Sequence, residues 1–172
     1  NSQNNLLNLI LPAFDQAIFE IYSKEKNKGV SKLLSKKSLL NLDCYASGGM
    51  FFKGQNYQKM LTEAVESKKK GYLGYKYRPP MPKNNLSHQQ RIKNPPPLDI
   101  KTIEIFSSKL RAKLGSKFKI MIDLGCRCKD IKDTKYLFEM FKEHNYYFVE
   151  EPFKRDFKSY EILNKIKTKI NI

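Results

Sequence analysis

Two acidic residues at the ends of short apolar segments are the first candidates for chemistry in this sequence. Asp123 ends the segment 119–123 and Glu150 ends the segment 147–150, and both segments have the continuous apolar pattern of strands in a parallel sheet. Apolar residues at helical spacing lie between them, so the three segments predict a βαβ unit. Both carboxylates then lie at the same end of one sheet. Carboxylates are ligands that Mg²⁺ prefers, although ordinary polar strand ends have the same pattern.

Two basic residues end an earlier predicted strand and extend this candidate site. Lys76 and Arg78 are two residues apart in the segment 72–78, so they lie on one face of the strand. A solvated strand end is the alternative interpretation of such a pair.

A proline-rich loop, 79–97, follows that strand and is far longer than most connections between elements. Long loops at the C-terminal ends of parallel strands tend to line binding sites. His88 and Arg91 are therefore candidate substrate contacts. If the loop is instead an insertion without function, both side chains are merely solvated.

The elements that must position these residues alternate along the chain. Predicted helices span 11–26, 56–70, 98–114 and 159–167, with another around 136–141, and predicted strands span 42–47, 72–78, 119–123 and 147–150, with a fifth beginning at Ile170. Such alternation indicates an α/β fold with a parallel sheet. Four strand-helix units are half of a (β/α)₈ barrel, whereas an open doubly wound sheet would carry a glycine-rich phosphate loop that is absent here. We therefore predict the first half of a TIM-type barrel.

Two regions follow from this pattern. Residues 1–41 form a helix and connector that precede the barrel, and residues 42–172 form the N-terminal half of the barrel, which stops at the fifth strand. The chain begins at Asn1 and not at Met, and it stops where another strand begins. We expect a fragment of a longer protein.

Composition limits the partners. The formal net charge is +16, but 28 of the 33 basic residues are lysines spread along the chain, a bias that A/T-rich codons also produce. Arginine, which reads phosphate and guanine best, is scarce, so we expect no nucleic-acid partner. Cys44, Cys126 and Cys128 form neither an even disulfide set nor a four-ligand zinc set. With no apolar run of membrane-spanning length and no signal peptide, we expect a cytoplasmic protein without a membrane partner.

Several short motifs, in their order along the chain, resemble the enolase superfamily, specifically its mandelate-racemase-like branch. They are Lys76-Tyr77-Arg78, Met121-Ile122-Asp123, Val149-Glu150-Glu151-Pro152 and, before the barrel, the helix Ala17-Ile18-Phe19-Glu20-Ile21-Tyr22-Ser23-Lys24. The resemblance covers nearly the entire chain. It implies an α+β capping domain followed by a modified TIM barrel, with chemistry at the C-terminal ends of the strands.

The resemblance also implies roles for individual residues. Asp123 and Glu150 correspond to two of three acidic ligands of Mg²⁺, and the third would lie just beyond Ile172, as would a His-Asp dyad. Lys76 and Arg78 occupy the family's Lys-x-Lys positions, facing the substrate carboxylate and its α-carbon. Ser47 resembles a position that contacts the substrate carboxylate.

The sequence departs from the family pattern at two positions. Arginine stays protonated at any working pH, so Arg78 is suited to holding an oxyanion and not to taking a proton. As a neighbouring cation it should lower the pKa of Lys76, which leaves Lys76 or the missing histidine as the base. The second departure is Asp123-Leu124-Gly125, where the family often has Asp-x-Asn.

The implied function is Mg²⁺-dependent abstraction of the proton α to a carboxylate, with an acid-sugar dehydratase as the first choice. A racemase or epimerase of a carboxylic acid uses the same enolate chemistry and is the alternative. A basic binding module without catalysis is the alternative from another class, but it would not need two acids and two cations at strand ends. We expect a small carboxylate as substrate and a homo-oligomer when the protein is full length.

Overall fold

The computed structural model describes residues 2–35, 37, 41–49, 56–81, 96–153, 157–166 and 171. The chain divides into two compact units, Asn1–Leu42 and Asp43–Ile172. Within the described ranges, no helix has both the length and the apolar character needed to cross a membrane.

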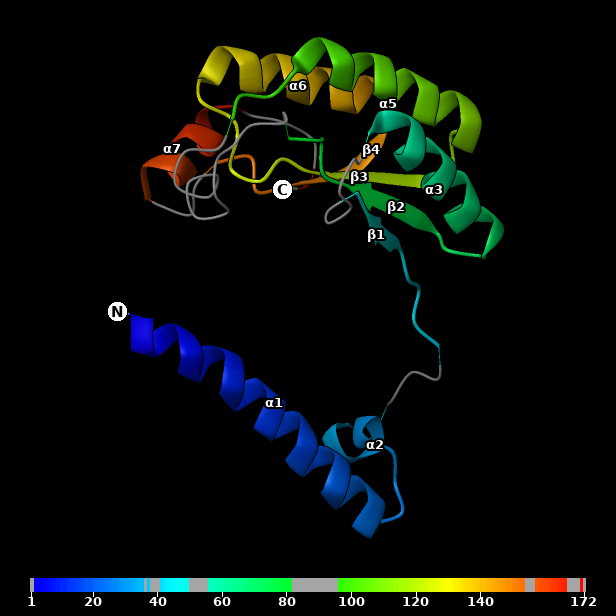
Figure 1. Ribbon diagram of the computed structural model, residues 1–172, viewed down its shortest axis with the longest axis vertical. Helices are drawn as coiled ribbons and strands as arrows, with labels where there is room; N and C mark the ends of the chain where they lie inside the picture. Colours follow the sequence, from blue (N-terminus) through cyan, green and yellow to red (C-terminus); the bar gives the residue numbers. More distant parts are fainter. Residues whose placement is uncertain are drawn as a thin grey trace. The chain divides into compact units, whose positions relative to one another are not determined.

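The first unit consists of α1 (Ser2–Glu25) and α2 (Val30–Leu34) (Figure 1). α1 begins well before Leu11, so the predicted start was wrong. The helix continues through Pro12, although an interior proline removes one backbone hydrogen bond and crowds the preceding turn. Asn27 ends the helix by adopting a left-handed conformation with φ 48°. Several large apolar side chains on this helix, among them Phe14 and Ile18, are exposed.

The second unit is a parallel sheet with alternating helices, which confirms the predicted α/β fold class. Its strands are hydrogen-bonded in the order β1-β2-β3-β4, and α3, α5 and α6 lie on the same face of the sheet (Figure 1). The elements are β1 (Ala46–Gly48), α3 (Tyr57–Lys69), β2 (Gly74–Tyr77), α5 (Ile100–Leu114), β3 (Lys119–Asp123), α6 (Ile131–Glu143), β4 (Tyr146–Glu150) and α7 (Phe157–Ile166).

A fifth strand was expected at Ile170, which lies outside the described residues. Its neighbour Asn171 forms a parallel bridge with Phe148, and its carbonyl accepts a hydrogen bond from the Val149 N–H at 3.0 Å. The chain therefore returns alongside β4, on the edge away from β3.

Side-chain caps explain where three of the helices begin. Asn56, Asp99 and Asp130 precede α3, α5 and α6, and each side chain accepts a hydrogen bond from the backbone N–H three residues later. Such caps satisfy N–H groups that have no partner inside the helix. The capping residues thus locate the helices that cover the sheet.

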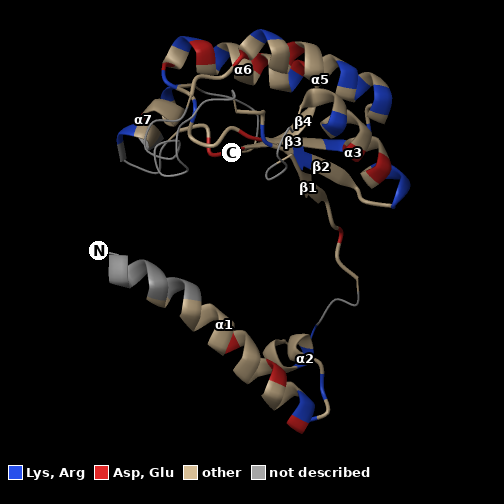
Figure 2. Cartoon of the chain, viewed as in Figure 1, with Lys and Arg blue, Asp and Glu red and all other residues tan. Residues whose placement is uncertain are grey.

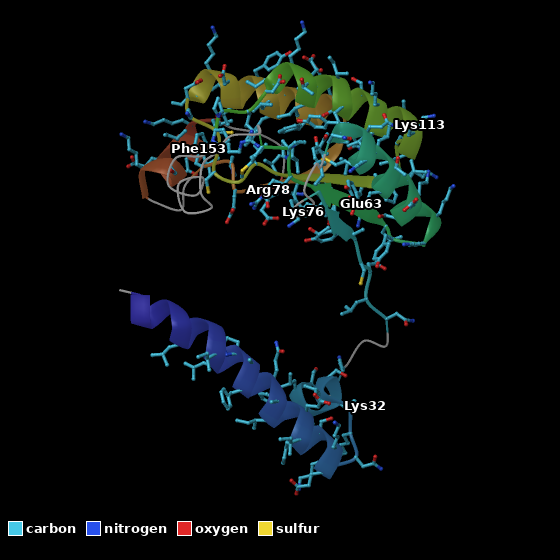
Figure 3. All side chains as sticks on the ribbon, viewed as in Figure 1. Lys32, Glu63, Lys76, Arg78, Lys113 and Phe153 are labelled. Atoms are coloured by element: carbon cyan, nitrogen blue, oxygen red, sulfur yellow. The ribbon has the colours of Figure 1, made fainter. Side chains whose placement is uncertain are left out.

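The two faces of β2 and β3 have different environments. Tyr75, Tyr77, Ile120 and Ile122 are fully buried in the core with the helices. Because side chains alternate along a strand, Lys76 lies on the opposite face. Figure 3 shows Lys76 and Arg78 pointing away from the helical layer.

Three buried hydroxyl groups tie the site-bearing strand to this core. The Tyr77 and Tyr146 hydroxyls lie 2.8 Å apart, and the Ser107 hydroxyl lies 2.8 Å from that of Tyr146. Ser107 donates to the Ile103 carbonyl within α5. Tyr77 lies between Lys76 and Arg78 in the sequence, so the network ties the strand that leads into the site to the buried core.

Basic residues occupy many positions on the outer helices. Figure 2 shows lysine and arginine along α3, α5 and α6, interspersed with acidic residues. This distribution matches the spread of lysines along the sequence.

Candidate active site

The register of the sheet brings the predicted acidic and basic residues to one end of three adjacent strands. Asp123 of β3 is the direct Cα partner of Glu150 in β4, and Tyr77 of β2 is the partner of Ile122. Arg78 follows Tyr77 and so lies level with Asp123. The prediction that both acids lie at the same end of one sheet is confirmed, whereas their role as metal ligands stays a prediction.

Asp123 is buried and fully engaged by short-range partners. Only 1% of the residue is exposed. Its Oδ2 accepts hydrogen bonds from Arg78, from Nε at 3.0 Å and also from Nη2, and its Oδ1 accepts from the Gly125 N–H at 2.9 Å. A buried carboxylate is tolerated only with such compensation, which the Arg78 guanidinium and the Gly125 N–H provide.

Glu150 is paired with Lys76 of β2. The Nζ atom of Lys76 donates to Glu150 Oε2 at 2.5 Å, and 12% of the Lys76 side chain is exposed. The Tyr45 ring centroid lies 5.9 Å from the same Nζ, within the range of a cation–π contact. Lys76 therefore reaches diagonally past β3 to an acid on β4.

The pair with Glu150 changes the pKa of Lys76 in the direction opposite to the one predicted from the sequence. Burial lowers its pKa, but the hydrogen bond and the negative charge of Glu150 outweigh burial and raise the pKa above the ordinary value for lysine. The predicted lowering by Arg78 was wrong, because Arg78 is itself engaged by Asp123 and the nearest charge to Lys76 is a carboxylate. In this arrangement Lys76 is a protonated cation and not a free base.

The loops that follow β3 and β4 run side by side and continue the pairing of the two strands. Three hydrogen bonds join them, from the N–H groups of the first loop to carbonyls of the second: Leu124 to Glu150 at 2.9 Å, Cys126 to Glu151 at 2.7 Å and Cys128 to Pro152 at 3.0 Å. Cys126 and Glu151 have positive φ angles of 61° and 46°. Left-handed backbone at non-glycine residues is unfavourable and is often found near functional sites.

Of the three other residues predicted to contact the substrate, the structure describes one, Ser47. Ser47 is exposed on β1 and is the Cα partner of Lys76, so it lies on the same face of the sheet. His88 and Arg91 lie outside the described residues. Glu151, which the resemblance includes in its motif, has its Oε2 4.0 Å from Nη2 of Arg78.

The donor atoms at the strand ends are of the kind that Mg²⁺ takes. Asp123 and Glu150 offer carboxylate oxygens on adjacent strands, which fits a hard cation. Among the described residues, no three His, Cys, Asp or Glu side chains are grouped closely enough to hold a metal ion. Two carboxylates therefore offer suitable donor atoms, and each already pairs with a cation: Glu150 with Lys76 of β2, and Asp123 with Arg78, the residue after β2.

Sequence reasoning missed two arginines that organise the backbone. Arg127 is 2% exposed and donates to carbonyls on both sides of the proline-rich loop. Arg111 donates to carbonyls that precede β3 and β4. Arg127 follows the last proline of that loop by 30 residues in the sequence, so no local signal indicated that the two would meet.

Comparison with known proteins identifies the fold. No protein-family model and no curated protein sequence matches the chain. Among solved structures, an enolase from Sargasso Sea environmental sequencing matches with TM-score 0.70 and 23% identity, over 98% of this chain and 44% of its own. L-talarate dehydratase from Polaromonas sp. JS666, complexed with Mg and L-glucarate, matches with TM-score 0.69 and 19% identity, over 92% and 39%. The chain therefore shares its fold with part of these solved structures.

A third similar structure is D-glucarate dehydratase from Agrobacterium tumefaciens, complexed with magnesium, with TM-score 0.59 and 21% identity over 82% of this chain and 35% of its own. These neighbours confirm the resemblance to the enolase superfamily and the partial TIM-type barrel. The chain spans between 34% and 44% of the length of eight solved structures that it matches.

Proposed function

We propose that the protein removes the proton α to a carboxylate with the help of Mg²⁺, and that its reaction is dehydration of an acid sugar. The observation that carries this proposal is the convergence of two carboxylates and two cations at the ends of β2, β3 and β4. Neighbours of the same fold include an L-talarate dehydratase complexed with Mg and L-glucarate and a D-glucarate dehydratase complexed with magnesium. A non-catalytic binding module would not require this arrangement.

Asp123 and Glu150 are the residues that would hold the ion. When bound, Mg²⁺ supplies a Lewis acid for the negative charge that develops on the substrate carboxylate, a pairing of base and metal for which this superfamily is a known example. Buried Asp123 keeps its orientation through the Gly125 N–H.

Arg78 and Lys76 would act on the substrate itself. Arg78 is permanently charged and has a planar fork of donors, so it holds a substrate oxyanion. Lys76 accepts a proton only as a neutral amine, and its bond to Glu150 keeps it protonated. Proton abstraction by Lys76 therefore requires that Glu150 exchange Lys76 for another partner. Otherwise Lys76 is a second counter-charge, and another residue is the base.

Racemisation of a carboxylic acid is the second candidate within this chemistry. A racemase from Streptomyces coelicolor A3(2) with bound magnesium is among the similar structures, with TM-score 0.54 and 18% identity over 75% of this chain. Both reactions begin with the same proton abstraction, so the two candidates differ only after the enolate has formed.

Exchange of the substrate α-proton with deuterated solvent, followed by mass spectrometry, tests the shared step. L-glucarate with Mg²⁺ is a suitable first substrate, because a neighbour binds it. We expect exchange in the wild-type full-length enzyme, partial exchange with weakened binding in Arg78→Lys, and little or none in Lys76→Met.

A matched control is Lys113→Met, which removes an exposed lysine of α5 (Figure 3) and should exchange like wild type. Wild-type exchange in Lys76→Met together with none in Arg78→Lys would reverse the assigned roles. No exchange by the wild-type enzyme across a panel of acid sugars would favour the binding module.

A further inference from the structure

The most completely buried cation in the described part of the chain is Arg127, which lies in the loop after β3. Only 2% of the residue is exposed. Its Nε donates to the Pro96 carbonyl, its Nη1 to the Pro79 carbonyl and its Nη2 to the Pro97 carbonyl, each at 2.9 Å. Among the described residues, no carboxylate lies within ion-pair distance of this guanidinium. Its hydrogen-bond partners within the described ranges are neutral carbonyls, which is an unusual use of a buried charge.

The chemistry of proline explains why one arginine is needed here. Pro79, Pro96 and Pro97 have no backbone N–H, so segments built from them cannot form a hydrogen-bonded ladder with each other. Pro79 and Pro96 are buried, and buried carbonyl groups must have a donor. The guanidinium provides several donors in one plane, which lets it satisfy three carbonyls from two segments at once.

Arg127 is also directly connected to the candidate active site. It follows Asp123 by four residues, and the carbonyl that it holds at Pro79 belongs to the residue after Arg78. The Arg78 guanidinium lies against Gly125, where an added Cβ would be 3.5 Å from Arg78 Cζ and Nε. Arg127 thus holds the backbone next to Arg78, while Asp123 and Gly125 contact the guanidinium at the end of the Arg78 side chain.

We propose that Arg127 is a positioning residue that sets the orientation of Arg78 toward Asp123 by holding the Pro79 carbonyl. The orientation of Arg78 by Arg127 does not depend on the function proposed above. Only the expected loss of catalysis in Arg127 variants rests on that function. Lysine at position 127 would keep the charge but replace the planar fork with one ammonium group, which cannot reach three carbonyls in the same geometry.

Arg111 provides a matched control for a purely structural role. It is half-buried and donates to four backbone carbonyls, those of His144 and Phe118 at 2.9 Å, Gly115 at 2.6 Å and Asn145 at 2.9 Å. These residues precede β3 and β4, at the end of the sheet opposite to Asp123 and Glu150. Burial lowers the pKa of both arginines. Arg111→Lys therefore removes comparable bonds without touching the site.

The test uses the full 172-residue chain labelled with ¹⁵N-arginine. The sequence has five arginines, so the Nε–H spectrum has at most five signals, and loss of one in Arg78→Lys assigns the Arg78 signal. We expect the Arg78 Nε–H to shift and to exchange with water about tenfold faster in Arg127→Lys. In Arg111→Lys the Arg78 signal should keep its position and its exchange rate.

An unchanged Arg78 signal in folded Arg127→Lys would overturn the proposal, since Arg127 would then fasten the loop without affecting the site. Loss of folding in both Arg127→Lys and Arg127→Gln, with Arg111→Lys folded, would also contradict it, because Arg127 would be a residue of general stability. A perturbed Arg78 signal in an enzyme that shows no α-proton exchange would support the positioning role and refute the proposed function. The positioning role of Arg127 and the proposed function can therefore be refuted independently of each other.

Discussion

The hydroxyl groups of Tyr77, Tyr146 and Ser107 offer a quantitative test of how the core holds the site-bearing strand. Tyr146→Phe removes the hydroxyl that both others contact at 2.8 Å. Ser107 keeps the Ile103 carbonyl as a partner, but the buried Tyr77 hydroxyl loses the Tyr146 hydroxyl that lies 2.8 Å from it. An unsatisfied buried hydroxyl costs about 1–3 kcal/mol, so we expect Tyr146→Phe to lower the free energy of unfolding by about 2 kcal/mol.

Tyr77→Phe should cost less, because the Tyr146 hydroxyl still has Ser107 as a partner. In a chain that already carries Tyr77→Phe, the change Tyr146→Phe leaves no unsatisfied hydroxyl at position 77. The double variant should therefore be more stable than the sum of the single losses predicts, by about 1 kcal/mol. Urea unfolding followed by circular dichroism measures all three variants, with exposed Tyr147→Phe as a control that should change stability by less than about 0.5 kcal/mol. Additive losses would refute the shared-hydroxyl reasoning.

Two further predictions concern close packing and thiol chemistry. Gly74→Ala should destabilise the chain by about 3 kcal/mol, because a Cβ there would lie 2.8 Å from the Lys119 carbonyl oxygen. As a control, a Cβ at Gly71 meets no neighbour within 4 Å, so Gly71→Ala should cost only about 1 kcal/mol for its positive φ. Thermal unfolding measures both variants. Burial raises the pKa of Cys128 from 9.0 to about 11. The stability contributed by the buried neutral thiol is therefore fully present below pH 9 and is lost as the pH rises through 11. Iodoacetamide labelling followed by mass spectrometry should therefore modify exposed Cys44 well before Cys128 at pH 9.

The sheet was predictable because local signals and periodicity agree. The segment 119–123 matches β3 residue for residue, since its apolar run is bounded by polar residues and buried by the helices. The boundary of β4 differed by one residue, because an irregularity between Ile120 and Met121 pairs Tyr146 with Ile120 and Phe148 with Met121. That irregularity depends on pairing between strands, which no single segment encodes.

The charge arrangement of the site was less predictable. The sequence indicated that Lys76 and Arg78 share a face, but it did not indicate that Lys76 reaches Glu150, two strands away, while Arg78 takes Asp123. These pairings depend on register and on the length of each side chain. The consequence for the pKa of Lys76 therefore had the wrong sign. Arg127 was missed for a similar reason, because its role depends on loops that meet only in the folded chain.

The most direct test of the central claim is calorimetric titration with Mg²⁺. We expect weak binding to the wild-type chain, abolished in Asp123→Asn and in Glu150→Gln, because these carboxylates would be the ligands. Glu139→Gln, which changes an exposed acid of α6, should bind like wild type. If the wild-type chain bound no Mg²⁺ up to about 10 mM, or if both Asp123→Asn and Glu150→Gln bound it as well as wild type, the strand-end carboxylates would not form the proposed metal site.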